Sequence, residues 1–241
     1  MTPALTLANG FKAIKSDKPI TIDGKSDESI WEKATSYPID QIILGENLTK
    51  EDFSGSFKLV WDENTLYINA QIQDDILFDQ HANPLYKYWD DDCLEIFIDE
   101  DNSGGDHQFS FNAFAYHVAL DNQAVDFGES IAGKPASPIL LNDHIKSVWR
   151  RNEKAPHQIT WEVAVRIVDD TFQYLAPIEK SLVKLHKGKI MGFMLAYCDN
   201  DGSETREHFI GSTYIKPING DKNLGYKTAD VFDTLILIDN K

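Results

Sequence analysis

The sequence contains little cysteine, since Cys93 and Cys198 are the only two in 241 residues. Two cysteines cannot supply the disulfide framework on which small secreted domains depend. Both lie in apolar segments typical of strands, DDCLEIF and MLAYCDN. Because free cysteines are commonly buried, we predict two buried thiols, with a single disulfide between them as the alternative.

Basic residues are also in short supply. Lys and Arg number 23 against 39 Asp and Glu, which gives a formal net charge of −16. An acidic surface repels phosphate groups, so we predict no nucleic-acid partner and no attraction to anionic membranes. Neutral ligands remain open, and so do hard cations such as calcium.

Long apolar runs and catalytic motifs are missing. No run approaches the ~18 apolar residues of a transmembrane helix, and residues 1–15 lack the pattern of a signal peptide. HExxH, GxSxG and the Walker loop do not occur, so metal catalysis, nucleophilic triads and phosphate binding have no support. No Gly/Ser linker divides the chain, which predicts one domain over 1–241 with 1–18 as an N-terminal extension.

The chain does contain a series of strand-like segments. Two extended runs in 56–74 flank the polar DENT and predict a hairpin. Helix signals are confined to 27–34 and to 171–188, which Pro177 interrupts, while 129–144 is predicted to be a long loop. We therefore predict an all-β fold, an antiparallel, jelly-roll-like β-sandwich with short helices and long loops. The other predicted strands are 93–99, 107–120, 157–168, 189–199 and 230–239.

Side-chain alternation along two of these strands predicts a polar patch. In 93–99 the acid Glu95 points away from the face that its apolar neighbours form. If 107–114 pairs with this segment in a hairpin, a polar stripe of the second strand lies ~5 Å from Glu95. Such a patch offers the donors and acceptors that sugar hydroxyls need. The stripe consists of Gln108, Ser110 and Asn112.

Two aromatic residues lie where they could stack on the apolar face of a sugar ring. Trp89 precedes the 93–99 strand, and Tyr226 lies in a loop rich in Gly, Asn, Asp and Lys. The alternative is that Trp89 caps the end of the sandwich and Tyr226 is an ordinary surface residue. The remaining tryptophans with strand or helix patterns are assigned to the core: Trp31, Trp61 and Trp161.

The loop 99–106, DEDNSGGD, is a candidate calcium site. Asp99, Asp101 and Asp106, with Asn102, supply closely spaced oxygens and glycines that permit tight turning. The loop lacks the twelfth-position glutamate of an EF-hand. A solvated hairpin loop is the alternative, and 199–204 is a second, weaker acidic turn.

The chain resembles the family 9 carbohydrate-binding modules and their wider sugar-binding relatives. The most specific segment is WDDDCLEIFIDEDN (89–102), an aromatic residue followed by Asp, an apolar residue and EIFID. The order and spacing of several weaker segments strengthen the resemblance. These segments are 20–34, 59–74, 107–114, 159–167 and 225–238.

The resemblance implies a function. It implies a non-catalytic β-sandwich that holds the terminal sugars of a plant-type polysaccharide between two aromatic rings, here Trp89 and Tyr226, with polar contacts from neighbouring strands. Tyr226 stands where the family usually has tryptophan, and Ser110 stands where characterised modules carry arginine. The resemblance also implies structural calcium, polysaccharide catabolism, a monomer in an extracellular, periplasmic or cell-surface location, and association with a glycoside hydrolase as its module or partner.

The alternatives to this function are a glycoside hydrolase and a haem-binding sandwich. A glycoside hydrolase would need a carboxylate pair such as Glu95 and Glu162, which retaining enzymes hold ~5 Å apart. A haem-binding sandwich would need axial ligands such as His107 or His117, although no spacing singles out a pair.

Overall fold

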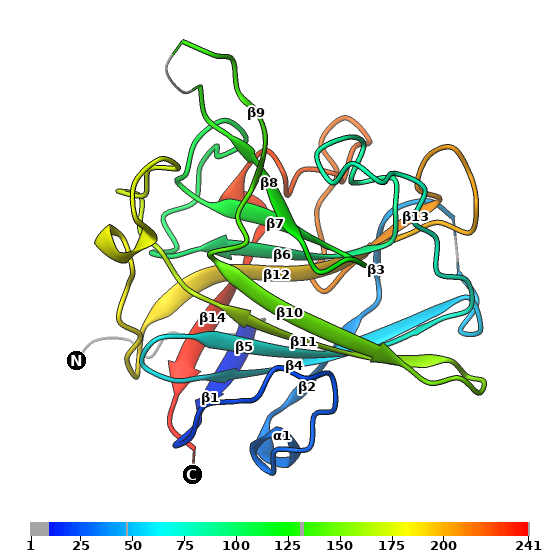
Figure 1. Ribbon diagram of the computed structural model, residues 1–241, viewed down its shortest axis with the longest axis horizontal. Helices are drawn as coiled ribbons and strands as arrows, with labels where there is room; N and C mark the ends of the chain where they lie inside the picture. The colour runs from blue at the N-terminus through cyan, green and yellow to red at the C-terminus, as the bar shows by residue number, and fades with distance from the viewer. Residues whose placement is uncertain (1–9, 47, 131–132, 241) are drawn as a thin grey trace.

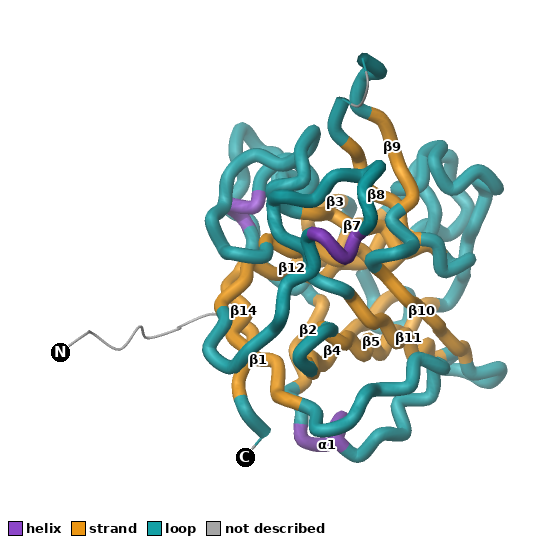
Figure 2. Tube along the Cα trace, turned by 60° about the vertical axis from the view of Figure 1, so that its left-hand side comes forward, coloured by secondary structure: helices purple, strands orange, loops and turns teal. Residues whose placement is uncertain are grey.

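The computed structural model describes residues 10–46, 48–130 and 133–240 (Figure 1). Residues 1–9 of the predicted N-terminal extension lie outside the described residues, whereas 10–15 form the first strand of the fold. Helix is limited to α1 (Ile30–Lys33) and the 3₁₀ turns η1 (Ile178–Lys180) and η2 (Ala229–Val231) (Figure 2). The strands are β1 (Gly10–Lys15), β2 (Ser36–Ile39), β3 (Gln41–Leu44), β4 (Phe53–Trp61), β5 (Leu66–Asp74), β6 (Cys93–Asp99), β7 (Phe114–Ala119), β8 (Ala124–Gly128), β9 (Ser137–Leu140), β10 (Ile145–Arg151), β11 (Gln158–Val165), β12 (Ile190–Asp199), β13 (His208–Gly211) and β14 (Asp233–Ile238).

The strands form two packed layers (Figure 1). One layer runs β10-β11-β5-β4 with β2 beside β4, and the other runs β14-β12-β6-β7-β8-β9. Among the described strands, pairing is antiparallel except at β1, which lies parallel to both β14 and β4 and so joins the layers. The predicted all-β sandwich is confirmed, with β1 as a parallel exception.

The apolar core lies between the two layers. Trp61 of β4 is 1% exposed and Trp161 of β11 is 0% exposed, and both belong to one cluster with Leu94 and Ile96 of β6. Burial of a large apolar side chain stabilises a fold by roughly 2–3 kcal/mol. Trp31 is buried in a smaller cluster around α1. The assignment of the three tryptophans to the core is therefore confirmed.

Several strand predictions are confirmed and one is partly wrong. The hairpin of β4 and β5 and the strand β6 occur where the sequence predicted them. Residues 107–113 are turns rather than strand, and β7 begins only at Phe114. Ser110 N donates to His107 O at 3.0 Å, which closes a turn in place of the predicted extended chain. The predicted loop 129–144 contains the short strand β9.

The face of β6 that points away from the core is buried as well. Cys93 and Phe97 are 0% exposed and Glu95 is 2% exposed. Cys93 lies opposite Cys198 in the β6–β12 register, and both are free and buried, as predicted. Glu95 is therefore a buried acid beside the apolar residues of a second, smaller cluster.

Within the described residues, no helix has the length and apolar character needed to cross a bilayer.

Candidate functional site

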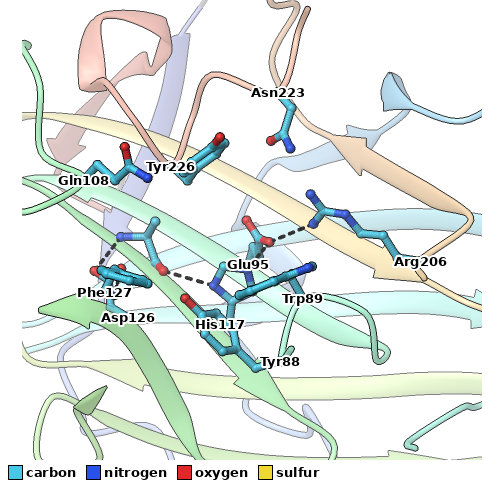
Figure 3. Close-up of a pocket in the computed structure, with 11 residues that line it drawn as sticks. Tyr88, Trp89, Glu95, Gln108, His117, Asp126, Phe127, Arg206, Asn223 and Tyr226 are labelled. Atoms are coloured by element: carbon cyan, nitrogen blue, oxygen red, sulfur yellow. Dashed lines mark hydrogen bonds and ion pairs between the residues drawn. The ribbon is translucent and has the colours of Figure 1, made fainter. Parts of the chain in front are cut away.

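A cavity of about 310 Å³ opens over the outer face of β6 (Figure 3). Four of the six residues predicted to bind carbohydrate line it, namely Trp89, Glu95, Gln108 and Tyr226. Its other lining residues come from the segment before β6, from β7 and β8, and from the loops on either side of β13: Tyr88, Ala115, His117, Asp126, Phe127, Arg206 and Asn223.

Trp89 forms one wall of the cavity and is supported from below by aromatic contacts. The ring is 39% exposed. Tyr88 packs edge-on against it with ring centroids 5.0 Å apart, and Tyr88 in turn packs edge-on against His117 at 4.6 Å. The indole is therefore held by edge-on aromatic contacts, and the exposed part of its ring remains available to a ligand.

Tyr226 lies on the other side of the cavity, so that Glu95 lies between the two rings in Figure 3. The Lys227 ammonium lies 4.8 Å from the centroid of the Tyr226 ring, a cation–π contact that restrains the ring. Asn223, from the same loop, adds an amide beside Tyr226.

Glu95 forms the floor of the cavity, and its Oε1 is held by several groups at once. The register of β6 and β7 places His117 directly opposite, where its Nε2 forms an ion pair with Oε1. Arg206 Nη1 lies 3.3 Å from the same oxygen, and the thiol of Cys198 donates to it at 3.3 Å. Among the described residues, the contacts to the Glu95 carboxylate all go to Oε1, which leaves Oε2 available as an acceptor.

The charges around Glu95 keep it ionised in spite of its burial. Burial alone would raise the pKa of Glu95, but the charge and hydrogen bond of His117, together with the charge of Arg206, outweigh this effect and lower its pKa. The guanidinium of Arg206 also lies 4.4 Å from the ring centroid of Phe209 and 2.9 Å from Cys198 Sγ. The floor therefore presents an anionic acceptor beside a fixed cationic donor.

A second acid, Asp126, lies in the wall of the cavity and accepts hydrogen bonds from two backbone N–H groups. Its Oδ2 accepts from Ala115 N at 2.9 Å and its Oδ1 from Phe127 N at 2.7 Å. Burial raises the pKa of Asp126 to about 6, although these two hydrogen bonds act in the opposite direction. The carboxylate thereby fixes Phe127, which lines the cavity.

The three aspartates that follow Trp89 hold its loop in place. Asp91 accepts from the backbone N–H groups of 80–81. Asp92 is 0% exposed and accepts from Phe78 N at 2.6 Å and Asn200 N at 2.8 Å. Asp90 accepts from the backbone N–H of Arg206 at 3.2 Å. Each buried carboxylate satisfies loop donors, so these acids position the wall and the charged floor of the cavity relative to each other.

Ser110 and Asn112 do not line this cavity. Since 107–113 is not a strand, the two side chains do not continue a stripe across the sheet from Glu95. Ser110 lines a neighbouring shallow hollow that also includes Gln108. Asn112 donates from Nδ2 to Gly104 O at 2.9 Å and so closes the 99–106 loop.

Sequence reasoning missed the two residues that pair with Glu95. His117 was noted only as a candidate haem ligand, although strand alternation from Ala115 would have placed it on the Glu95 face. Arg206 comes from the loop between β12 and β13, and no local pattern marks it. Arg206 places a cationic donor beside Glu95, whereas Ser110 stands where the resemblance leads one to expect an arginine.

In the predicted calcium loop the side chains of Asp99 and Asp101 meet, but no third acid joins them among the described residues. Asp99 Oδ2 accepts from Gly104 N at 2.7 Å, and Asp101 Oδ1 accepts from Ser103 N at 3.0 Å. Asp106 bridges to Thr228 through the backbone. Within the part of the chain that the structure describes, no group of three ligand atoms within 4.8 Å includes these aspartates. Calcium binding by this loop stays a prediction.

Glu162 and His107, one residue from each of the two alternative functions, do not line the cavity. Trp161 and Val163, the neighbours of Glu162, face the same core as the neighbours of Glu95, so the two glutamates point outward from opposite layers. Glu162 Oε2 accepts from Gly24 N at 2.8 Å and holds the turn before α1. His107 Nε2 lies 2.8 Å from Gly225 O.

Comparisons with known proteins agree with the fold. The sequence model for carbohydrate family 9 binding domain-like proteins matches residues 22–240. Endo-1,4-beta-xylanase C of Paenibacillus barcinonensis is 33% identical over 110 residues, which are 46% of this chain and 9% of the xylanase. Endo-1,4-beta-xylanase A of Thermotoga maritima is 35% identical over 81 residues, 34% of this chain and 7% of that protein. The chain thus matches less than a tenth of the length of these two relatives.

Solved structures show the same fold. A family 9 carbohydrate-binding module of Caldicellulosiruptor kristjanssonii in complex with cellotriose aligns with a TM-score of 0.65 and 18% identity over 95% of each chain. Its complex with glucose gives 0.66 and 18% over 96% of each chain. Fold and sequence together define a carbohydrate-binding β-sandwich module rather than a catalytic domain. The chain belongs to the carbohydrate family 9 binding domain-like family.

Proposed function

We propose that the cavity over β6 binds the end of a neutral glycan between Trp89 and Tyr226. The observation that carries this proposal is the Glu95 carboxylate, which is ionised and anchored through Oε1 while Oε2 is left for a ligand hydroxyl. Arg206 donates to a neighbouring sugar oxygen, and Gln108 and Asn223 bridge further hydroxyls. Two aromatic walls over a polar floor match a sugar ring, which has apolar faces and polar edges.

The ligand class follows from the charges of the cavity. The acids and the single arginine of the floor largely offset each other, which favours a neutral sugar over a strongly charged one. The related modules of known structure are complexes with cellotriose and glucose, which makes β-glucans the first candidates, and xylans follow from the xylanase relatives. The chain acts in polysaccharide catabolism outside the cytoplasm, as a monomeric module or partner of a glycoside hydrolase.

Calorimetry with glucose, cellotriose, xylotriose and their reduced forms tests the proposal. Trp89→Ala should weaken binding by roughly 10- to 100-fold, because aromatic stacking on a planar ligand contributes about 1–3 kcal/mol. The melting temperature should change by less than ~2 °C, because a residue this exposed contributes little to the core. Tyr214→Ala is the matched control, since Tyr214 is 67% exposed and lies outside the cavity.

Two outcomes would count against the proposal. A large drop in melting temperature for Trp89→Ala would make the ring a core residue and not a ligand platform. Turnover of the oligosaccharides by the wild-type protein, abolished in Glu95→Gln, would replace a binding function with a hydrolytic one.

A further inference from the structure

A second pocket, of about 330 Å³, lies at one end of the sandwich, where the turn between β9 and β10 meets the segment that contains η1. This segment is yellow and lies at the left of Figure 1. The pocket, here called the η1 pocket, is lined by 140–144, by Arg166 and by residues of 172–179. It shares no lining residue with the cavity over β6, so it is a separate place on the molecule.

His144 forms the floor of the η1 pocket, and one of its ring nitrogens has no partner. The side chain is 1% exposed, and its Nδ1 lies 2.8 Å from the hydroxyl of Tyr116. Among the described residues, nothing forms a hydrogen bond with His144 Nε2. Burial, with the charge of Arg166 adding to it, lowers the pKa of His144 to about 4, so the ring is neutral near neutral pH. A buried polar atom without a partner is costly, and native proteins retain few of them.

The Tyr116 hydroxyl determines which nitrogen of His144 carries the proton. Tyr116 is 2% exposed, and burial holds its pKa well above the usual range, so its hydroxyl keeps its hydrogen. Within the described chain, His144 Nδ1 is the partner of that hydroxyl. The hydroxyl satisfies its hydrogen by donating to Nδ1, which leaves the proton of the neutral ring on Nε2. The floor of the η1 pocket therefore presents a buried N–H donor that needs an acceptor atom.

The rim of the pocket restricts the charge of a ligand. Arg166 Nη2 donates to Glu179 Oε1 at 3.1 Å, and Arg166 Nη1 donates to Asp143 O at 3.3 Å. An anion gains little here, because one guanidinium already faces the acids Asp143 and Glu179, which both line the pocket. A cation would meet the N–H of His144 at the floor. A neutral ligand with hydroxyl groups fits both, because hydroxyls accept from the floor and donate to the acids of the rim.

Part of the pocket wall is apolar. Phe172 packs edge-on against His144 with ring centroids 4.6 Å apart, and Phe172 and Ile178 are each 6% exposed. The half-buried ring of Tyr174 also lines the pocket. Apolar walls with a few placed polar groups suit a compact ring compound that has apolar faces and polar edges.

We propose that the η1 pocket is a second binding site for a neutral sugar, in which a sugar oxygen accepts a hydrogen bond from His144 Nε2. Ala115 and His117 of β7 line the cavity over β6, whereas Tyr116 between them faces the core and contacts His144. The two sites therefore lie on opposite faces of β7. The inference does not rest on glycan binding by the cavity over β6, because no residue lines both.

The Trp89→Ala variant tests this proposal, because it weakens the other cavity and leaves the η1 pocket intact. In ¹⁵N NMR of the full chain, the Nε2 resonance of His144 should shift on titration with methyl β-glucoside or methyl β-xyloside. The dissociation constant should be on the order of 1 mM, as expected for a ligand of this size. Cellotriose and xylotriose distinguish the source of the sugar: tighter binding of the trisaccharides indicates a polysaccharide chain, and equal binding indicates a free monosaccharide.

Ala176→Trp places a large ring in the η1 pocket and should weaken the sugar response of His144 at least tenfold. Leu175→Trp is the matched control, since Leu175 is the neighbouring residue, is 77% exposed and does not line the pocket. It should leave the response unchanged.

Three results would overturn the proposal. The first is a His144 resonance that none of the four sugars moves at about 50 times the expected dissociation constant, which would mean that the pocket holds only water. The second is an equal loss of response in Ala176→Trp and Leu175→Trp. The third is tighter binding of D-glucuronate than of D-glucose, which would make the ligand an anion. If Ala176→Trp fails to fold, the titrations of Trp89→Ala decide the question without it.

Discussion

Two regions of this molecule bury carboxylates, and they neutralise them differently. Around Glu95, His117 and Arg206 supply positive charge from within the fold, and the pKa of Glu95 is lowered despite burial. Around Asp74 and Asp199, unpaired oxygens remain and burial raises both pKa values to about 7.

The difference separates a site prepared for a neutral ligand from one that needs a charged one. A carboxylate whose charge is already balanced can accept hydrogen bonds from hydroxyls without attracting ions. A group of acids with unpaired oxygens is stabilised only by protons or by a cation from solution. The contrast can be tested by removing the positive charge beside Glu95, by changing the pH, and by changing the cavity wall alone.

The largest expected effect comes from Arg206→Met, which removes the guanidinium beside Glu95. Glu95 then keeps His117 and the thiol of Cys198 as partners, and breaking a buried ion pair by removing one partner costs about 3–5 kcal/mol. We expect the free energy of unfolding in urea to fall by this order and glycan binding to be lost. The floor of the cavity would then resemble the second region, with an undercompensated buried acid.

The double variant Glu95→Gln/Arg206→Met is the control, because it leaves neither charge alone. It should recover part of the stability that Arg206→Met loses. A single variant as stable as the wild type would show that Arg206 does not compensate Glu95, and the contrast between the regions would disappear.

The two regions should also respond oppositely to pH. Asp74 and Asp199 have raised pKa values in the folded state, so the stability they contribute is complete below their unfolded pKa of ~3.9 and is lost as pH rises through about 7. Glu95 has a lowered pKa, so its contribution is present above its unfolded pKa of ~4.3 and is lost only at lower pH.

We therefore expect the free energy of unfolding to fall by about 3–5 kcal/mol between pH 5 and pH 8. Asp74→Asn should flatten the profile, whereas Asp101→Asn should not. A profile that Asp74→Asn leaves unchanged would show that Asp74 is not the group behind the fall in stability. The charged groups facing the two titrating acids are Asp52, Asp75, Asp92, Arg151, Asp201, Glu207 and His208.

The sequence predicted the strand that carries Glu95 but only part of what surrounds it. Alternation in CLEIFID predicts β6 and the direction of Glu95, because successive side chains of a strand point to opposite faces. The same alternation in 107–113 misled: Phe111 is 5% exposed while Phe109 is 56% exposed, and a turn closes between His107 and Ser110. Local pattern cannot distinguish such a turn from a short strand.

The residues that contact Glu95 and Asp74 come from distant parts of the sequence and are brought together only by the tertiary structure. Arg206 meets Glu95 through a loop fixed by Asp90, and neither position shows a spacing that sequence could read. Asp74 and Asp199 each end a strand in a short acidic turn, and each turn resembles solvated surface. They converge because β5 and β12 end at the same place in opposite layers, where Tyr197 reaches Asp74. The 99–106 loop has more acids in a row, yet among the described residues no third acid joins Asp99 and Asp101.

The smallest expected effect concerns the cavity wall alone. Tyr226→Trp should raise glycan affinity by about 2- to 5-fold in calorimetry, because indole offers a larger stacking surface, and aromatic contacts contribute about 0.5–1.5 kcal/mol beyond area. Tyr226→Phe should bind like the wild type if the ring, and not its hydroxyl, contacts the sugar. Neither change should alter the pH dependence of stability, since Tyr226 contacts Lys227 and the cavity but none of the buried aspartates of the second region. An altered pH dependence would mean that the two regions are coupled through the loops that flank Arg206. A loss of glycan affinity in Tyr226→Trp would mean that the wall is too close to Trp89 for a larger ring.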